Sequence, residues 1–214
     1  MLIDEVKKLI EQLSEKSASG GYLPDDEYSN YAALAQLKAI DQMSELLDYN
    51  QQIIVLASDV IKSQNVIVTS GLFQRPSDYY KYVSSTARYF ENGKWDEEAA
   101  ELIGVSERAD RVKSEIVTPT FQFPVISETQ SGFRFDPAEI GQGVLTYFVN
   151  PVTPVWAAQD GVFPPTFDPA NSTDFVLSNK FKNYLVREIS NMFSIEIKDV
   201  ALQQATIQNM LTTS

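Results

Sequence analysis

Apolar residues recur at helical spacing near both ends of the chain, and strand-like runs fill the middle. In residues 2–16, leucine, valine and isoleucine return every three or four positions, while Lys7 and Glu11 fall on the opposite side. This pattern predicts an amphipathic helix with Lys7 on its polar face. A second, longer helix is expected over residues 25–47. Pro24 and a run of three acidic residues open it, and carboxylates there favour the positive end of the helix dipole.

Helical periodicity returns in the C-terminal part. Aromatic and aliphatic residues at three- and four-residue spacing predict a helix that begins near Ser178. Ser194 is expected to be the N-cap of a further helix, because serine at that position can accept a hydrogen bond from a free backbone N–H group.

Strands are predicted between these helical ends. Residues 118–156 carry aromatic and β-branched residues broken by Pro and Gly, which is typical of two or three strands, and residues 65–69 are also β-branched. Asn92–Gly93 lies between two strand-like runs and is the strongest short signal for a hairpin. Residues 94–105 stay open between strand and helix because their composition is helical; a returning strand is favoured. Ser106 is expected to cap a short helix.

The order helices, strands, helices predicts an α+β protein. We expect N- and C-terminal helices that form a bundle, with a small antiparallel β-domain inserted between them. The expected divisions are an N-terminal helical part over residues 1–64, a β-rich domain with a Pro-rich arm over 65–175, and C-terminal helices over 176–214 that pack back on the N-terminal ones.

Composition and charge narrow the classes of function. The 214 residues include 17 Lys and Arg against 29 Asp and Glu, a net charge of −12, with no His and no Cys. A negative field of this size argues against a nucleic-acid-binding groove. Without His or Cys, the commonest general base, the thiol nucleophile and the ordinary zinc ligands are missing. No glycine-rich phosphate-binding motif is present. We therefore expect no enzyme, no cofactor and no metal site.

One cluster of carboxylates has both a catalytic and a structural interpretation. The acidic run Asp96, Glu97, Glu98 and Glu101 could supply the paired carboxylates of a glycoside hydrolase, but a solvated charged face is favoured.

The chain has no run of 18 apolar residues, and acidic residues occupy the place of a signal peptide's apolar core. We expect a protein that is made in the cytoplasm.

A long connection from about Asn150 to Asp174 carries the candidate binding residues. It is rich in proline yet also apolar, and long connections without secondary structure usually serve a function. Prolines stiffen the chain and lower the entropy lost on docking. We predict that this arm makes subunit contacts, with packing inside its own subunit as the alternative. The candidate interface residues are Val155, Trp156, Val162, Phe163 and Phe167.

Nearly the whole chain carries a series of short segments whose order and spacing are informative. They are Gly21-Tyr22-Leu23-Pro24 with Tyr31, Ala35, Gln36 and Leu37; Pro119-Thr120-Phe121-Gln122-Phe123-Pro124; Leu145-Thr146-Tyr147-Phe148 with Pro151, Pro154 and Trp156; Phe167-Asp168; and Asp174-Phe175. In order and spacing this series resembles a structural protein of crAss-like and related podoviruses that infect Bacteroidetes.

The resemblance implies a structural component of a bacteriophage virion, a neck or tail ring protein of the head-to-tail adaptor type. It implies a cyclic homo-oligomer, usually a dodecamer, that contacts the portal or other neck and tail rings and lets DNA pass through its channel. It implies no catalysis, no cofactor and no membrane, and a final location in the virion after synthesis in the host bacterial cytoplasm. The alternative is a non-catalytic binding module of a tail or fibre assembly, for which aromatic residues on an exposed sheet and few helices are expected. The helices predicted at both ends of the chain count against it.

Overall fold

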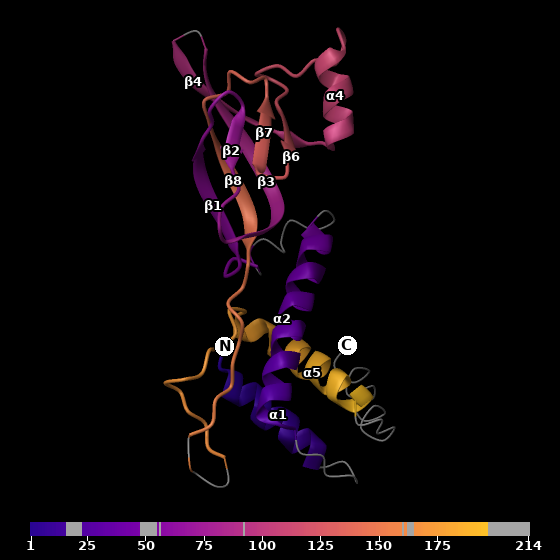
Figure 1. Cartoon of the computed structure of the whole chain (residues 1–214), viewed down its shortest axis with the longest axis vertical. Helices are drawn as coiled ribbons and strands as arrows, with labels where there is room; N and C mark the ends of the chain where they lie inside the picture. The colour runs from indigo at the N-terminus through magenta and orange to yellow at the C-terminus, as the bar shows by residue number, and fades with distance from the viewer. Residues whose placement is uncertain are drawn as a thin grey trace. The chain divides into compact units, whose positions relative to one another are not determined.

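The chain folds into two compact units (Figure 1). The computed structural model describes residues 1–15, 23–47, 55, 57–91, 93–159, 161 and 165–196. The helical unit comprises Met1–Val60 and Pro151–Ser214, and the β unit, Ile61–Asn150, is inserted between these two segments of the chain. The protein is therefore of the α+β class. The expected boundary at residue 175 differs from this division, because the arm after Asn150 belongs to the helical unit.

The helical unit is built from three α-helices within its described residues. These are α1 (Ile3–Glu15), α2 (Asp25–Leu47) and α5 (Lys182–Glu196), the last preceded by the 3₁₀ turn η1 (Asn179–Phe181). The first α2 hydrogen bond runs from the Tyr28 N–H to the Pro24 carbonyl, so the predicted start is confirmed. Helix α5 contacts both α1 and α2. The buried apolar side chains that fill this unit include Ile3, Val6, Ile10, Tyr28, Ala32, Ala35, Ala39, Ile40, Leu185, Ile189 and Phe193.

The C-terminal expectation is partly wrong. Helix α5 runs on to Glu196, so Ser194 lies inside it and is not an N-cap. The helix expected after Ser194 falls mainly on residues 197–214, which lie outside the described residues.

The β unit contains two four-stranded sheets. Sheet A has the order β1-β8-β3-β4, and sheet B has the order β2-β7-β6-β5. Neighbouring strands are antiparallel except β5 and β6, which are parallel. The strands are β1 (Ile61–Ile67), β2 (Leu72–Gln74), β3 (Tyr79–Glu91), β4 (Lys94–Ala99), β5 (Glu101–Leu102), β6 (Val125–Glu128), β7 (Gly132–Asp136) and β8 (Gln142–Val149).

The two sheets share one apolar core. Leu145 and Tyr147 from sheet A pack in the same cluster as Phe133 and Phe135 from sheet B. The sheets approach closely at Gly143, where an added Cβ would lie 3.0 Å from the Phe135 ring and 2.7 Å from the Thr86 carbonyl oxygen. Glycine is therefore required there for packing.

The Asn-Gly hairpin is confirmed, and it resolves the ambiguity of residues 94–105. Strand β4 pairs with β3 over residues 94–99, so tertiary pairing overrides the helical propensity of this acidic segment. A short helix, α4 (Val105–Lys113), follows. Its N-cap is Gly104, whose carbonyl accepts the Arg108 N–H at 2.9 Å, so the expected cap at Ser106 is wrong.

Candidate interaction sites

The arm after Asn150 pairs with itself. Val155 and Thr173 exchange two backbone hydrogen bonds of 2.9 and 2.7 Å, and the Gln159 N–H donates to the Thr166 carbonyl at 2.8 Å. The Ala157 N–H donates to the Ser172 hydroxyl at 2.9 Å. These bonds and two isolated bridges hold the described residues of the arm as an irregular hairpin.

The helices α1 and α2 hold this arm in place. The buried side chain of Gln36 donates to the Val152 carbonyl at 3.0 Å and accepts from the Val176 N–H at 2.9 Å. The Ser29 hydroxyl accepts from the Trp156 N–H at 3.1 Å. One amide side chain thus satisfies backbone groups on both sides of the arm, which a buried backbone requires.

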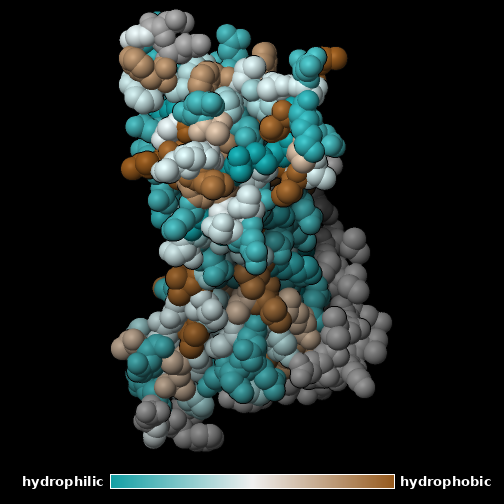
Figure 2. All heavy atoms as spheres, turned by 45° about the horizontal axis from the view of Figure 1, so that its top comes forward, coloured by the Kyte–Doolittle hydropathy of each residue, from teal (hydrophilic) through white to brown (hydrophobic). Residues whose placement is uncertain are grey.

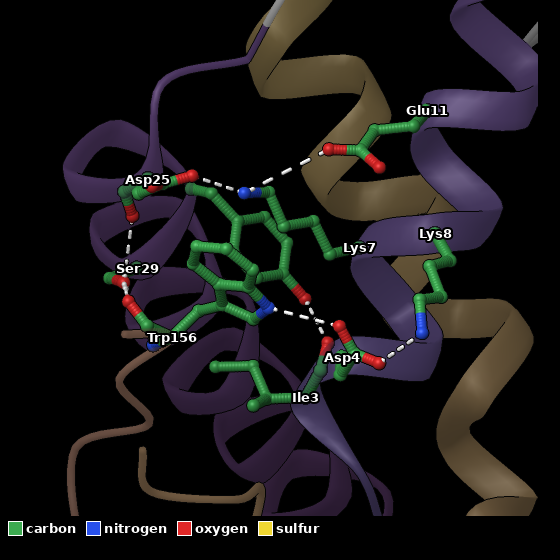
Figure 3. Close-up of polar contacts among 9 residues, drawn as sticks. Ile3, Asp4, Lys7, Lys8, Glu11, Asp25, Ser29 and Trp156 are labelled. Carbon is green, nitrogen blue, oxygen red and sulfur yellow. Dashed lines mark hydrogen bonds and ion pairs between the residues drawn. The ribbon is translucent and has the colours of Figure 1, made fainter. Parts of the chain in front are cut away.

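Lys7 and Trp156 form the centre of this contact (Figure 3). The Lys7 ammonium lies 3.4 Å from the centroid of the Trp156 ring, forms an ion pair with Asp25, and lies 3.8 Å from a carboxylate oxygen of Glu11. Lys7 is only 3% exposed. Its predicted place on the polar face of the first helix is therefore wrong, because the arm and Tyr28 cover that position.

The other polar groups at this contact also have partners. The indole N–H of Trp156 donates to an Asp4 carboxylate oxygen at 3.2 Å, and Asp4 pairs with Lys8 at 2.6 Å (Figure 3). The Tyr28 hydroxyl donates to the Ile3 carbonyl at 2.7 Å, and burial raises the pKa of Tyr28. A satisfied network of this kind holds the two segments together.

The candidate interface residues occupy different environments. Trp156 is 6% exposed inside the helical unit, while Val155 is exposed. Phe167 is half-buried, with its ring centroid 6.0 Å from that of Trp156. Val162 and Phe163 lie outside the described residues. Their part in subunit contacts stays a prediction.

A second candidate, the α4 surface, lies on the β unit. We define it as Ile116, Val117 and Phe123 together with Leu102, Val105 and Val112, all of which are exposed. Ile116 is 93% exposed and Phe123 75%, and both line one hollow with Glu101 and Arg111. None of the side chains of α4 is buried. Figure 2 shows hydrophobic residues at the surface among hydrophilic ones on the face that it displays.

A polar contact anchors α4 to sheet B despite this exposure. Arg108 forms a two-pronged pair with Asp136, one bond of which measures 3.0 Å. Asp136 is buried, and Arg134 Nε lies 3.8 Å from its Oδ1. Helix α4 is therefore held on the outer face of sheet B by charge and leaves its own valines facing solvent.

A third candidate, the aromatic face, lies at the end of sheet A. We define it as Phe90 and Trp95 with Arg88, Glu97 and Gln142, which the register of β3, β4 and β8 places side by side. Phe90 is 61% exposed and Trp95 59%. The sequence analysis did not identify this face. The predicted two-residue Asn-Gly turn was a signal for it, because such a turn pairs Phe90 with Trp95.

Glu97 sits in this face as an ion-paired group. Arg88 donates to it at 2.8 Å and Thr86 at 2.9 Å, and these bonds hold the pKa of Glu97 below its usual value. Glu101 pairs instead with Arg111, which lowers the pKa of Glu101. Glu97 and Glu101 thus accept bonds from different arginines.

Comparison with known proteins gives no family. No protein-family model matches the chain, and no curated protein is significantly similar to it. Over the described residues, no three acidic side chains cluster as a metal site would need, and no helix is long and apolar enough to cross a membrane.

Proposed function

We propose that this chain is a structural component of a bacteriophage virion, a ring-forming neck or tail adaptor between portal and tail. The α4 surface is the observation that carries the proposal. Its most exposed residues, Ile116 at 93% and Phe123 at 75%, lie beside a helix with no buried side chain. Exposed apolar clusters with a polar rim mark protein–protein interaction sites. Here Glu101 and Arg111 supply that rim.

The helical unit supplies the second part of the proposal. We propose that α1, α2 and α5 form the bundle of the adaptor, which the contacts of α5 with both other helices support. Val155 and Phe167 on the arm would then meet a neighbouring subunit, with Trp156 as the anchor that fixes the arm. A cyclic homo-oligomer, expected to be a dodecamer, would place one subunit's α4 surface or arm against the next.

The charge of the chain supports a DNA conduit over a DNA-binding site. A net charge of −12 repels a polyanion and lets DNA slide without being held. The surface that faces the channel should therefore be negative or neutral. A continuous belt of Lys and Arg along the channel wall would contradict this part of the proposal.

Imaging of particles tests the proposal. Virions encoded by the same genome as this chain should contain it, and cryo-electron microscopy should place both units in a ring around the neck or tail channel. In parallel, the double variant Ile116→Ser with Phe123→Ser should lose incorporation. Its thermal melting should stay unchanged because both side chains are exposed. Absence of the chain from purified particles would overturn the proposal.

The aromatic face favours a second candidate function, a non-catalytic binding module of a tail or fibre assembly. Phe90 and Trp95 are aromatic residues on an exposed sheet, the feature expected of such a module. A module of this kind would appear at the periphery of the particle, and its α4 surface variants would still be incorporated.

A further inference from the structure

The aromatic face is built differently from the α4 surface. The rings of Phe90 and Trp95 lie 5.5 Å apart at an interplanar angle of 62°, and both project from the solvent side of sheet A. A cross-strand aromatic pair stabilises a hairpin by at most about 1 kcal/mol, which accounts for the pair itself. It does not account for the ordered polar side chains next to it.

These polar side chains are fixed before any ligand arrives. Arg88 donates to the Glu97 carboxylate at 2.8 Å and to the side-chain amide oxygen of Asn65 at 3.0 Å. Thr86 holds the other oxygen of Glu97 at 2.9 Å. Gln142 lies directly opposite Arg88 on β8. A guanidinium group has five N–H donors, and the two bonds described leave donors available. Such preorganisation lowers the entropy lost on binding.

The combination matches the chemistry of a sugar ring. A pyranose has one face of C–H groups that packs on a flat aromatic side chain, and an edge of hydroxyl groups that both donate and accept hydrogen bonds. Trp95 supplies the flat surface, while Arg88, Glu97 and Gln142 supply planar donors and acceptors around the same hollow. Polar groups placed beside an apolar surface set orientation and specificity in small-ligand sites.

Size and charge select among possible ligands. Five residues line the hollow, Arg88, Trp95, Asp96, Glu97 and Gln142, which suits one or two sugar rings. A stable protein partner instead buries about 1,200 Å² or more in total. Glu97 neutralises Arg88, so the side chains of this face carry no net charge, while the whole chain has a net charge of −12. Sulfated, phosphorylated or sialylated glycans and nucleic acids would be repelled.

We propose that the aromatic face of sheet A binds neutral glycans, with a sugar ring stacked on Trp95 and hydrogen-bonded by Arg88, Glu97 and Gln142. Phe90 supports the indole from the neighbouring strand. This role is independent of the adaptor proposal, because it uses none of the residues of the α4 surface or the arm.

The test is binding of the full chain to immobilised oligosaccharides. A panel of neutral oligosaccharides of glucose, mannose, galactose and N-acetylglucosamine is compared with sulfated and sialylated ones, followed by calorimetric titration with the best neutral disaccharide. We expect retention by at least one neutral glycan and none by the anionic ones. Failure to retain any neutral glycan, or a preference for the anionic set, would overturn the proposal.

Variants then locate the site. Trp95→Ala should weaken binding by about tenfold or more, Trp95→Phe by less, and Arg88→Ala by about tenfold. Leu34→Ala, which removes an exposed apolar side chain from α2, is the matched control and should bind as the parent does. Circular dichroism and melting curves confirm folding of each variant. If Trp95→Ala and Trp95→Phe both bind normally, the glycan site lies elsewhere and the proposal fails.

A protein partner is the competing outcome. In that case no glycan binds, while Trp95→Ala still folds and loses self-association or incorporation into particles. The adaptor proposal would survive that result, whereas the glycan proposal would not. Conversely, if the chain binds a glycan but is absent from virion rings, the glycan proposal is supported and the adaptor proposal fails.

Discussion

The ammonium of Lys7 lies over the ring of Trp156, 3.4 Å from its centroid, and pairs there with Asp25. Three segments that are distant in sequence, α1, the start of α2 and the arm, therefore meet at one buried charge. A cation over an indole in a desolvated site stabilises by about 2 kcal/mol. This contact fixes the arm as part of the helical unit.

Trp156→Ala should destabilise the helical unit. Removing a buried tryptophan costs about 3–5 kcal/mol of unfolding free energy, because the side chain leaves a cavity and the Lys7 charge loses its cover. Denaturant unfolding measures the change. The control Leu34→Ala removes an exposed leucine and should change the free energy of unfolding by about 0.5 kcal/mol or less. A loss below about 1 kcal/mol for Trp156→Ala would contradict this packing.

Lys7 and Trp156 should be energetically coupled. In a double-mutant cycle with Lys7→Met and Trp156→Leu, which removes the aromatic ring, the coupling free energy should be about 0.5–2 kcal/mol in favour of the native pair. Lys7→Met alone also leaves Asp25 without its ammonium partner. Additive effects of the two substitutions, within about 0.3 kcal/mol, would mean that the ring contact contributes nothing.

The Arg108–Asp136 pair should hold α4 on sheet B. Arg108→Ala leaves a buried carboxylate with only Arg134 nearby, so a loss of about 3 kcal/mol in unfolding free energy is expected. Amide hydrogen exchange should rise first in α4. The control Arg75→Ala breaks an exposed pair with Glu128 and should cost about 1 kcal/mol or less. Equal costs for the two substitutions would show that burial of Asp136 does not matter.

Gly143 and Gly141 should respond differently to alanine. A Cβ at Gly143 would clash with the Thr86 carbonyl and the Phe135 ring, while a Cβ at Gly141 meets nothing within 4 Å. Gly143→Ala should therefore destabilise the β unit by about 1–3 kcal/mol. Gly141→Ala should be neutral. Thermal melting of the two variants decides the point, and a neutral Gly143→Ala would show that the sheets lie further apart.

The β unit should lose stability in acid through Asp78. Hydrogen bonds from Lys62 and the buried Tyr147, each 2.7 Å long, lower the pKa of Asp78 in the folded state. A lowered folded-state pKa contributes stability that is present above the unfolded value of about 3.9 and is lost as the pH falls through the folded value. Asp78→Asn should therefore flatten the fall of the melting temperature between about pH 5 and pH 2.

A matched variant makes this acid test specific. Asp96→Asn removes an exposed charge from β4 and should leave the fall in melting temperature close to that of the parent chain. If Asp78→Asn and the parent lose stability in parallel as the pH falls, Asp78 does not carry the acid sensitivity of the β unit.

The sequence by itself determined the local elements and one register. Helical spacing and the acidic first turn place α2 at residues 25–47, because these signals act within one helix. The Asn-Gly pair places the β3–β4 hairpin, since a two-residue turn fixes which residues face each other. The pairing of Phe90 with Trp95 follows from that turn alone.

Only the tertiary structure decided which positions are covered. Lys7 carries a charge and falls on the polar side of its helix, and nothing near it in sequence shows that Trp156 buries it. The acidic residues 94–99 favour a helix locally, but pairing with β3 makes them a strand. The sequence of the arm predicts docking but does not identify the surface it docks on, and Gln36 and Ser29 on α2 hold it. Burial and strand pairing join residues far apart in sequence, so they depend on long-range packing that local patterns do not contain.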